Sequence, residues 1–162
     1  MRYLSVDVEI REVMEYFHEA ANEADKSTCT SAKCGAVIAN NRLIIGRGFN
    51  SPPRGLESQR RCIFNKENYD RKITDRTCCI HAEQRAILDA LKNNKDKIVG
   101  SSLYFTRVGK DGDFINSGKP YCTLCSKMSL DVGISKFFLW HEEGICVYNT
   151  EEYNEISYSY RE

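Results

Sequence analysis

The apolar residues of this chain follow a helical period first and a strand-like pattern next. Between Val6 and Ala24 they recur at helical spacing with charged residues between them, which predicts an amphipathic helix. Two short apolar runs, Cys34–Ala39 and Leu43–Phe49, flank Asn40-Asn41. Runs rich in β-branched residues around such a dipeptide predict a β-hairpin with its turn at the asparagines.

The second half of the chain alternates between helix and strand patterns. Helical periodicity covers His81–Leu91 and Cys122–Val132, whereas Ser102–Arg107 and Lys136–Trp140 are β-rich. The polar stretch from Asn50 to Arg76 predicts a loop with room for a short helix. The order helix, hairpin, helix, strand, helix, strand predicts a mixed sheet flanked by helices.

Length and charge limit the classes of protein to consider. A chain of 162 residues with 41% hydrophobic residues predicts one domain, residues 1–162, with a single packed core. The 23 basic and 23 acidic residues cancel, so a polynucleotide partner would need a local basic patch. The N-terminal residues carry charges throughout and every apolar run is short. We therefore expect a cytoplasmic protein with no membrane partner.

The cysteines are the first sign of specific chemistry. Eight cysteines in a chain of this length and expected location indicate metal binding rather than a disulfide scaffold. Cys122 and Cys125 form a C-x-x-C at the start of a predicted helix, where free N–H groups and the helix dipole favour thiolates. His81 and Glu83 open the other predicted helix.

Together, these four residues predict a catalytic zinc site. One imidazole and two thiolates leave the fourth position of a zinc ion open to water, whose pKa the metal lowers to roughly 7. Glu83 is close enough to His81 in sequence to take and return a proton there. Alone, a C-x-x-C also fits a redox pair, half a structural zinc site or buried thiols, and a histidine at a helix start is more often a cap or core residue. His-x-Glu followed by Pro and C-x-x-C matches the zinc deaminase pattern.

The sequence resembles the cytidine and deoxycytidylate deaminase superfamily over Val6–Trp140. Besides the metal-binding motifs, SAKCGAVIANNRLIIGRGFNSPPRG and IHAEQRAIL are similar to the hairpin, the following loop and the first metal-binding helix of that family. The resemblance implies a three-layer α/β/α sandwich with a mixed central sheet. It implies the following site: Zn²⁺ held by His81, Cys122 and Cys125, Glu83 as proton shuttle, and substrate contacts from Asn50 and the backbone N–H of Ala82.

Within the superfamily, GRGFNSPPRG and the Gln84 that follows HAE resemble the deoxycytidylate branch. That branch implies a homo-oligomer that converts the free nucleotide dCMP to dUMP and releases ammonia. Two alternatives remain: a deaminase acting on a base in RNA or single-stranded DNA, and a non-catalytic, zinc-stabilised binding module. The zero net charge disfavours the first, and the presence of Glu83 disfavours the second.

Two residues depart from the family pattern. Tyr121 separates Pro120 from Cys122, where the family usually has Pro directly before the first cysteine. We expect the departure to affect the loop before the helix and not the zinc ligands. Arg85 stands where the nucleotide branch commonly has Asn; we expect an exposed helix-surface charge there, with phosphate contact as the alternative.

Other reactive residues leave alternatives open. Cys29, Cys62, Cys78 and Cys79 are compatible with a second, structural zinc site of the kind the resemblance allows, although we favour unligated thiols. Basic residues of the long loop are compatible with a phosphate pocket, although solvated charges are the usual case; they are Arg54, Arg60, Arg61 and Lys66.

The remaining candidates are assigned to packing. We expect Cys34 and Cys146 in the core, and His18 and His141 lack the spacing of a metal ligand pair. The C-terminal segment, with its tyrosines among acidic residues, is predicted to pack on the domain or on a second subunit, with stacking on a substrate base as the alternative.

Overall fold

A computed structural model describes residues 1–62, 64–73, 75–109 and 111–161. The helices are α1 (Asp7–Ala24), α2 (Ala82–Asn94), α3 (Thr123–Asp131) and α4 (Thr150–Tyr158). The strands are β1 (Arg2–Tyr3), β2 (Lys33–Asn40), β3 (Leu43–Phe49), β4 (Ser102–Val108), β5 (Phe114–Ile115), β6 (Lys136–His141) and β7 (Gly144–Asn149).

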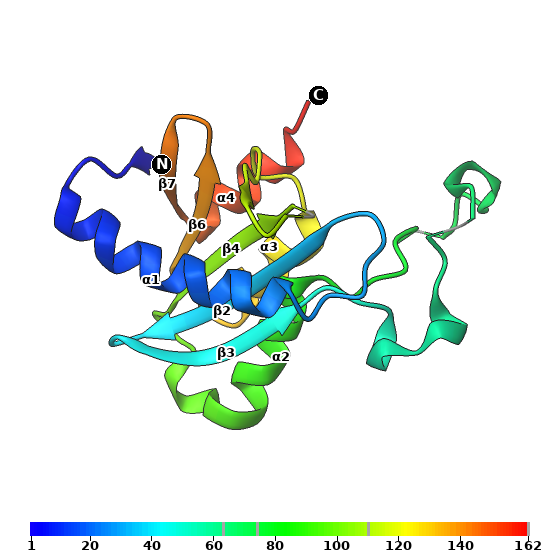
Figure 1. Ribbon diagram of the computed structural model, residues 1–162, viewed down its shortest axis with the longest axis horizontal. Helices are drawn as coiled ribbons and strands as arrows, with labels where there is room; N and C mark the ends of the chain where they lie inside the picture. The colour runs from blue at the N-terminus through cyan, green and yellow to red at the C-terminus, as the bar shows by residue number, and fades with distance from the viewer. Residues whose placement is uncertain (63, 74, 110, 162) are drawn as a thin grey trace.

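The strands form one mixed sheet in the order β1-β7-β6-β4-β2-β3, with β5 paired to β4. β4 and β6 run parallel, as a crossover through α3 requires, and the other neighbouring pairs are antiparallel. In Figure 1, α1 crosses one face of the sheet while α2 and α3 lie on the other. The predicted three-layer α/β/α sandwich with a mixed central sheet is therefore confirmed.

Each face of the sheet has its own core cluster, because alternate residues of a strand point to opposite faces. On the α1 face, Val13 and Phe17 pack with Val37 and Tyr104. On the opposite face, helices α2, α3 and α4 cover a second cluster built around Ile38, Leu103 and Phe137. The alternation along β2 and β4 thus decides which of their side chains face α2.

The hairpin forms as predicted, but its turn lies one residue later. Asn41 and Arg42 occupy the turn with φ values of 49° and 64°, the left-handed pair that a tight hairpin turn requires. At a register shift opposite Ile38 and Ala39, β3 has one extra residue, Ile45, and Asn40 consequently pairs with Leu43 inside the ladder. The predicted turn at Asn40-Asn41 is therefore wrong by one position.

The C-terminal segment adds two elements that the sequence patterns did not indicate separately. β7 pairs with β6, and α4 then packs on the sheet next to α3. The Tyr153 ring stacks on Phe137 with the ring centroids 4.0 Å apart, and Tyr148 is also buried. Packing on the domain is confirmed for these two tyrosines.

The segment between β3 and α2 projects from the body of the domain (Figure 1). Its described residues contain three single 3₁₀ turns, η1 (Pro53–Gly55), η2 (Glu57–Gln59) and η3 (Lys66–Asn68), consistent with the predicted loop. Ile63 and Thr74 of the predicted loop lie outside the described residues. In the described part of the chain, no helix combines the length and the apolar character needed to cross a bilayer.

Candidate active site

Two helix starts meet at the edge of the sheet and bring three metal-binding side chains together. His81 is the N-cap of α2 and Cys122 is the N-cap of α3, with Cys125 in the first turn of α3. The His81 Nδ1 atom lies 3.3 Å from each of the two sulfurs, and the two sulfurs are 3.2 Å apart. The sequence-predicted ligands are thus close enough to share one ion.

The donor set fits zinc. An imidazole nitrogen and two sulfurs are a borderline-soft combination that suits this ion, and three protein ligands leave one tetrahedral position open. A hydrogen bond from Cys125, together with His81, lowers the pKa of Cys122 to about 4, whereas Cys122 and burial hold the pKa of Cys125 well above its ordinary value. The hydrogen bond with Cys122 raises the pKa of His81 to about 9. Contacts within the cluster thus contribute to all three shifts, as expected of side chains held this close together.

Glu83 is the carboxylate of this cluster. It lies in the first turn of α2, is 5% exposed, and lines the same cavity as His81. Burial raises the pKa of its carboxyl to about 7, with the nearby imidazole acting in the opposite direction. A buried carboxyl with a pKa near neutrality suits a group that must both accept and donate a proton.

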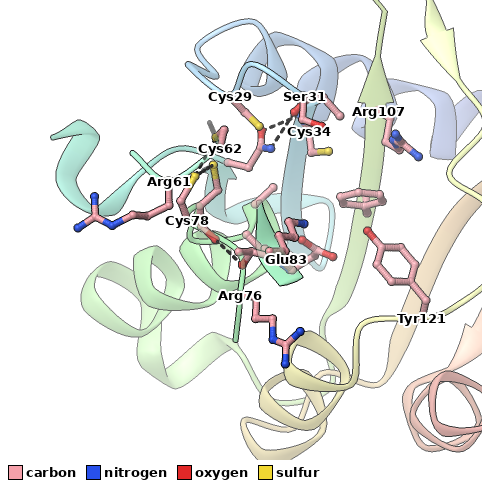
Figure 2. A pocket seen from close by; sticks show the side chains of 18 residues that line it. Cys29, Ser31, Cys34, Arg61, Cys62, Arg76, Cys78, Glu83, Arg107 and Tyr121 are labelled. Carbon is pink, nitrogen blue, oxygen red and sulfur yellow. Dashed lines mark hydrogen bonds between the residues drawn. The ribbon is translucent and has the colours of Figure 1, made fainter. Parts of the chain in front are cut away.

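A cavity of about 300 Å³ opens over the cluster (Figure 2). His81, Glu83 and Ala82 line it from α2, and Asn50 lines it from the end of β3. This size is at the lower end of the range for pockets that enclose a small molecule. The predicted site residues at the start of α2 and at the end of β3 therefore all line one cavity.

The Asn50 side chain is mostly committed to the cavity wall. Its Oδ1 accepts hydrogen bonds from the Ser27 hydroxyl at 2.6 Å and the Cys34 backbone N–H at 2.8 Å, and its Nδ2 donates to the Ala32 carbonyl at 2.8 Å. An amide NH₂ has two donors, so one N–H remains available for substrate. The direct contact with sugar or base stays a prediction.

Ala82 occupies the first position of α2, where backbone N–H groups have no partner inside the helix. The helix start is held very close to β3: a Cβ atom added at Gly48 would lie 2.2 Å from the Ala82 carbonyl oxygen. Only glycine permits this approach. The predicted contact from the Ala82 N–H to a ring carbonyl is geometrically open and stays a prediction.

The family described as "Cytidine and deoxycytidylate deaminase zinc-binding region" matches residues 9–141. The chain belongs to this family. A deoxycytidylate deaminase of Mycobacterium phage D29 is 31% identical over 130 residues, which cover 75% of this chain and 89% of the relative. A deoxycytidylate deaminase of Schizosaccharomyces pombe is 29% identical over 127 residues, covering 75% of this chain and 33% of that larger protein.

Solved structures agree with the family. The apo dCMP deaminase of cyanophage S-TIM5 aligns with a TM-score of 0.56 and 26% identity, covering 78% of this chain and 80% of that chain. Its complex with dCMP and dUMP aligns with a TM-score of 0.55 at 26% identity, covering 82% of each chain. The resemblance in sequence and the similarity in fold point to the same branch of the family.

Tyr121, the departure from the family pattern, lines the cavity of this deaminase-family domain. Its ring is half exposed and lies against Tyr160 of the C-terminal tail, with the centroids 5.9 Å apart. Loss of water contact and then the charge of Glu83 raise the pKa of its phenol. The extra residue leaves Cys122 and Cys125 in place next to His81.

Arg85 is not the exposed surface charge that the sequence suggested, and that prediction is wrong. The guanidinium is half-buried over the Phe49 ring, and its Nη2 atom donates to the Ser51 hydroxyl at 2.8 Å and the Pro52 carbonyl at 3.0 Å. It is not among the residues that line the cavity. Arg85 instead fastens α2 to the loop that carries Asn50.

A second group of thiols lies across the cavity from β4. The Cys62 and Cys78 sulfurs are 2.9 Å apart, the Cys78 and Cys79 sulfurs are 3.8 Å apart, and these three could hold a metal ion. Cys29 lies close enough to hydrogen bond with Cys79. Burial raises the pKa of Cys79, whereas the hydrogen bond with Cys78 lowers the pKa of Cys62 to about 7. A second zinc ion at this group stays the alternative to the unligated thiols predicted from the sequence.

The remaining cysteines and histidines lie in different surroundings. Cys146 is fully buried as predicted, whereas Cys34 lines the cavity as well as packing against the core. His18 packs edge-on against Phe114, and His141 lies between the hydroxyls of Tyr3 and Tyr148. Neither histidine joins a metal-binding group in the described part of the chain.

The basic residues of the long loop divide into two kinds. Arg61 and Lys66 line the cavity. Arg60 instead pairs with Glu57, its Nη2 lying 2.6 Å from a carboxylate oxygen, and Arg54 is not among the residues that line the cavity.

Sequence reasoning missed Phe105, Arg76 and Arg107 as cavity residues. The alternation in LYFTRV was the available signal, because it places Phe105 and Arg107 on one face of the strand.

Proposed function

We propose that this protein is a zinc-dependent hydrolase that converts dCMP to dUMP and releases ammonia. The observation that carries the proposal is the meeting of His81, Cys122 and Cys125 in one cluster, with His81 and the buried carboxyl of Glu83 lining one cavity. The similarity to dCMP deaminases in sequence and fold supports dCMP as the substrate.

The residues divide the chemistry between them. His81, Cys122 and Cys125 would hold the zinc ion, which supplies an acidified water as the nucleophile for C4 of the cytosine ring. Glu83 would take one proton of that water and deliver it to N3 of the ring, and would then move the second proton from the oxygen added at C4 to the leaving amine. Its raised pKa fits a carboxyl that alternates between both protonation states. Water first adds at C4 and the C4–N bond then breaks, so dCMP and water give dUMP and ammonia.

The cavity wall would orient the nucleotide. Asn50 would offer its remaining amide N–H to the sugar or base, and Ala82 its backbone N–H to the ring carbonyl. The metal cluster lies at the bottom of a cavity with four basic residues in its wall, which supports a free anionic nucleotide as ligand. We propose the cytoplasm as its location, as the composition suggested.

A homo-oligomer is part of the proposal. Apolar side chains on α2 and α3 are exposed in the single chain: Leu88 and Leu91 on α2, and Leu124 and Leu130 on α3. Because neighbouring exposed apolar residues often mark a subunit contact, they support self-association. Light scattering during size-exclusion chromatography measures the assembly; a mass equal to one chain at micromolar concentration would contradict this part.

The experiment that tests the function follows ammonia release from a panel of nucleosides and nucleotides of cytosine, adenine and guanine. We expect turnover with dCMP and formation of dUMP. Turnover of adenine or guanine compounds in place of cytosine compounds would contradict the proposed base, and preference for a single-stranded oligonucleotide would contradict the free nucleotide.

A further inference from the structure

The cavity above the metal-binding cluster has a basic wall. Four cationic side chains line it, whereas Glu83 is its single carboxylate among the described residues. The four are Arg61, Lys66, Arg76 and Arg107. A concave surface of one charge sign concentrates ligands of the opposite sign. The open end of this cavity is therefore built for an anionic group.

Of these four cationic residues, Arg107 lies on a strand, β4. Strand β4 places Leu103 and Phe105 in the core cluster beneath α2, and Arg107 follows at the next position of the same face. Arg107 also lies directly opposite Cys34 on β2, and both residues line the cavity. Arg61, Lys66 and Arg76 come instead from the segment that leads to α2.

The Arg107 charge has no acidic partner within the described part of the chain. The ion pairs found there engage other arginines, for example Arg47 with Glu19 and Arg60 with Glu57. Arg107 is nevertheless half-buried. Burial raises the pKa of the neighbouring Cys34 thiol to about 12, and Arg107 acts against that rise. Its charge is thus felt inside the cavity.

Arg61 offers a natural comparison. Its Nη1 atom donates to the Ser58 carbonyl at 2.8 Å and to the Arg60 carbonyl at 3.0 Å. In Figure 2 the Arg61 and Arg107 side chains lie on opposite sides of the cavity, and both point away from Glu83. Arg61 therefore carries the same charge at the same cavity while its guanidinium is occupied elsewhere.

We propose that Arg107 binds the 5′-phosphate of the substrate and makes this site selective for a nucleoside monophosphate over the nucleoside. The assignment rests on the proposed function, which places the cytosine amino group at Glu83 and so leaves the phosphate for the outer part of the cavity. A guanidinium presents two parallel N–H donors that match two phosphate oxygens. Arg107 is then a specificity residue that takes no part in the proton transfers.

The test compares dCMP with deoxycytidine in wild type, Arg107→Gln and the matched control Arg61→Gln. We expect Arg107→Gln to lower kcat/KM for dCMP about 10- to 100-fold, the usual effect of losing a charge-assisted hydrogen bond, chiefly through KM. Deoxycytidine turnover should stay near the wild-type value in all three proteins. Arg107→Lys should recover part of the dCMP preference, because the charge returns without the two-pronged donor.

Three outcomes would overturn the assignment. An equal loss for dCMP and deoxycytidine would show a structural role for Arg107. An unchanged preference for dCMP would show that Arg107 does not bind the phosphate. A selective loss in Arg61→Gln or Arg76→Gln, with Arg107→Gln unaffected, would move the phosphate to another part of the wall.

The proposed function has a separate readout in the same experiment. Wild-type protein that deaminates neither compound would contradict the function itself. The phosphate assignment would still be tested, because calorimetric titration with dUMP and deoxyuridine compares the two affinities without turnover. We expect Arg107→Gln to weaken dUMP binding selectively; equal weakening of both ligands, or of neither, would reject the assignment.

Discussion

At the scale of single residues, the metal-binding cluster depends on two helix caps. His81 and Cys122 are N-caps, so their side chains project from the ends of α2 and α3 instead of from a helix face. Cys125 then lies in the first turn of α3 and is fully buried. Because the helix ends fix these positions, a neighbouring side chain cannot take the place of a lost ligand. Each ligand should therefore be individually essential.

We expect His81→Ala, Cys122→Ala and Cys125→Ala each to lose both bound zinc and activity, since the remaining two ligands hold the ion poorly. Elemental analysis of the purified variants measures the zinc. The control is Cys146→Ala, a buried thiol on β7 outside the cluster, which should keep its zinc. A ligand variant with full zinc content and full activity would show that the assigned residue is not a ligand.

The number of zinc ions per chain shows whether the thiols of the long loop bind metal. The catalytic cluster alone predicts about one zinc per chain, whereas occupation of the Cys62, Cys78 and Cys79 group would give about two. If this group is occupied, Cys78→Ser should remove only the second ion, because the central thiol of the group is lost while His81 and its partners remain; unligated thiols predict an unchanged zinc content. Loss of all zinc in this variant would contradict independent sites.

At the scale of elements, the contact between β3 and α2 positions the cluster. Gly46 and Gly48 let the strand approach the helix backbone, and a Cβ at Gly48 would also lie 2.4 Å from the Ala86 nitrogen. Arg85 fastens the same helix to the loop after β3. The start of α2, with Ala82 and Glu83, is therefore fixed by direct backbone packing.

We expect Gly48→Ala to lower the free energy of unfolding by about 1–3 kcal/mol, because the added methyl must push α2 from the sheet. Activity should fall further than stability alone explains, since Glu83 moves with the helix. Thermal melting and turnover assays measure the two effects. The control Gly109→Ala meets its nearest atom, on Ile115, at 3.4 Å, an ordinary contact. Equal effects of the two substitutions would contradict the close-packing argument.

The same elements show what the sequence could and could not predict. Helical periodicity located α1, α2 and α3 within a few residues because each buries one continuous face. The hairpin turn moved by one residue because the extra residue of β3, Ile45, leaves no mark in the apolar pattern. β1 consists of two exposed residues, so no alternation could have indicated it.

Some features of the candidate site could likewise be predicted from the sequence, and others could not. His81, Glu83, Cys122 and Cys125 follow local motifs, whose spacing already requires a shared site. The role of Arg85 depends on Ser51 and Pro52, which only the fold brings to α2. Sequence reasoning considered Arg85 on its helix alone and so predicted exposure. The pattern of residues along the chain does not indicate such contacts between distant segments.

At the scale of the whole molecule, a metal ion would join two helices that follow different strands. α2 leads into β4 and α3 leads into β6, so an ion held by His81, Cys122 and Cys125 links both crossovers on one face of the sheet. Binding to the folded state alone stabilises it by mass action. The same ion would thus add to the stability of the fold and supply the proposed catalysis.

We expect removal of zinc by a chelator to lower the melting temperature and abolish activity together, and re-addition of zinc to restore both. Differential scanning fluorimetry and the ammonia assay follow the two properties in one titration. Because the sheet core is built from side chains outside the cluster, the apo protein should remain folded at low temperature. Full activity after complete removal of the metal would contradict a catalytic zinc.

The most direct test of the whole account is dCMP turnover by Glu83→Gln, measured together with zinc content and the melting curve. Gln retains the size of the side chain, so zinc binding, folding and dUMP binding should survive. We expect the rate to fall by at least ~10⁴, the upper end for one acid–base group, because the same carboxyl serves the water, the ring nitrogen and the leaving amine. A zinc-loaded, folded Glu83→Gln protein within about tenfold of the wild-type rate would contradict the proposed mechanism.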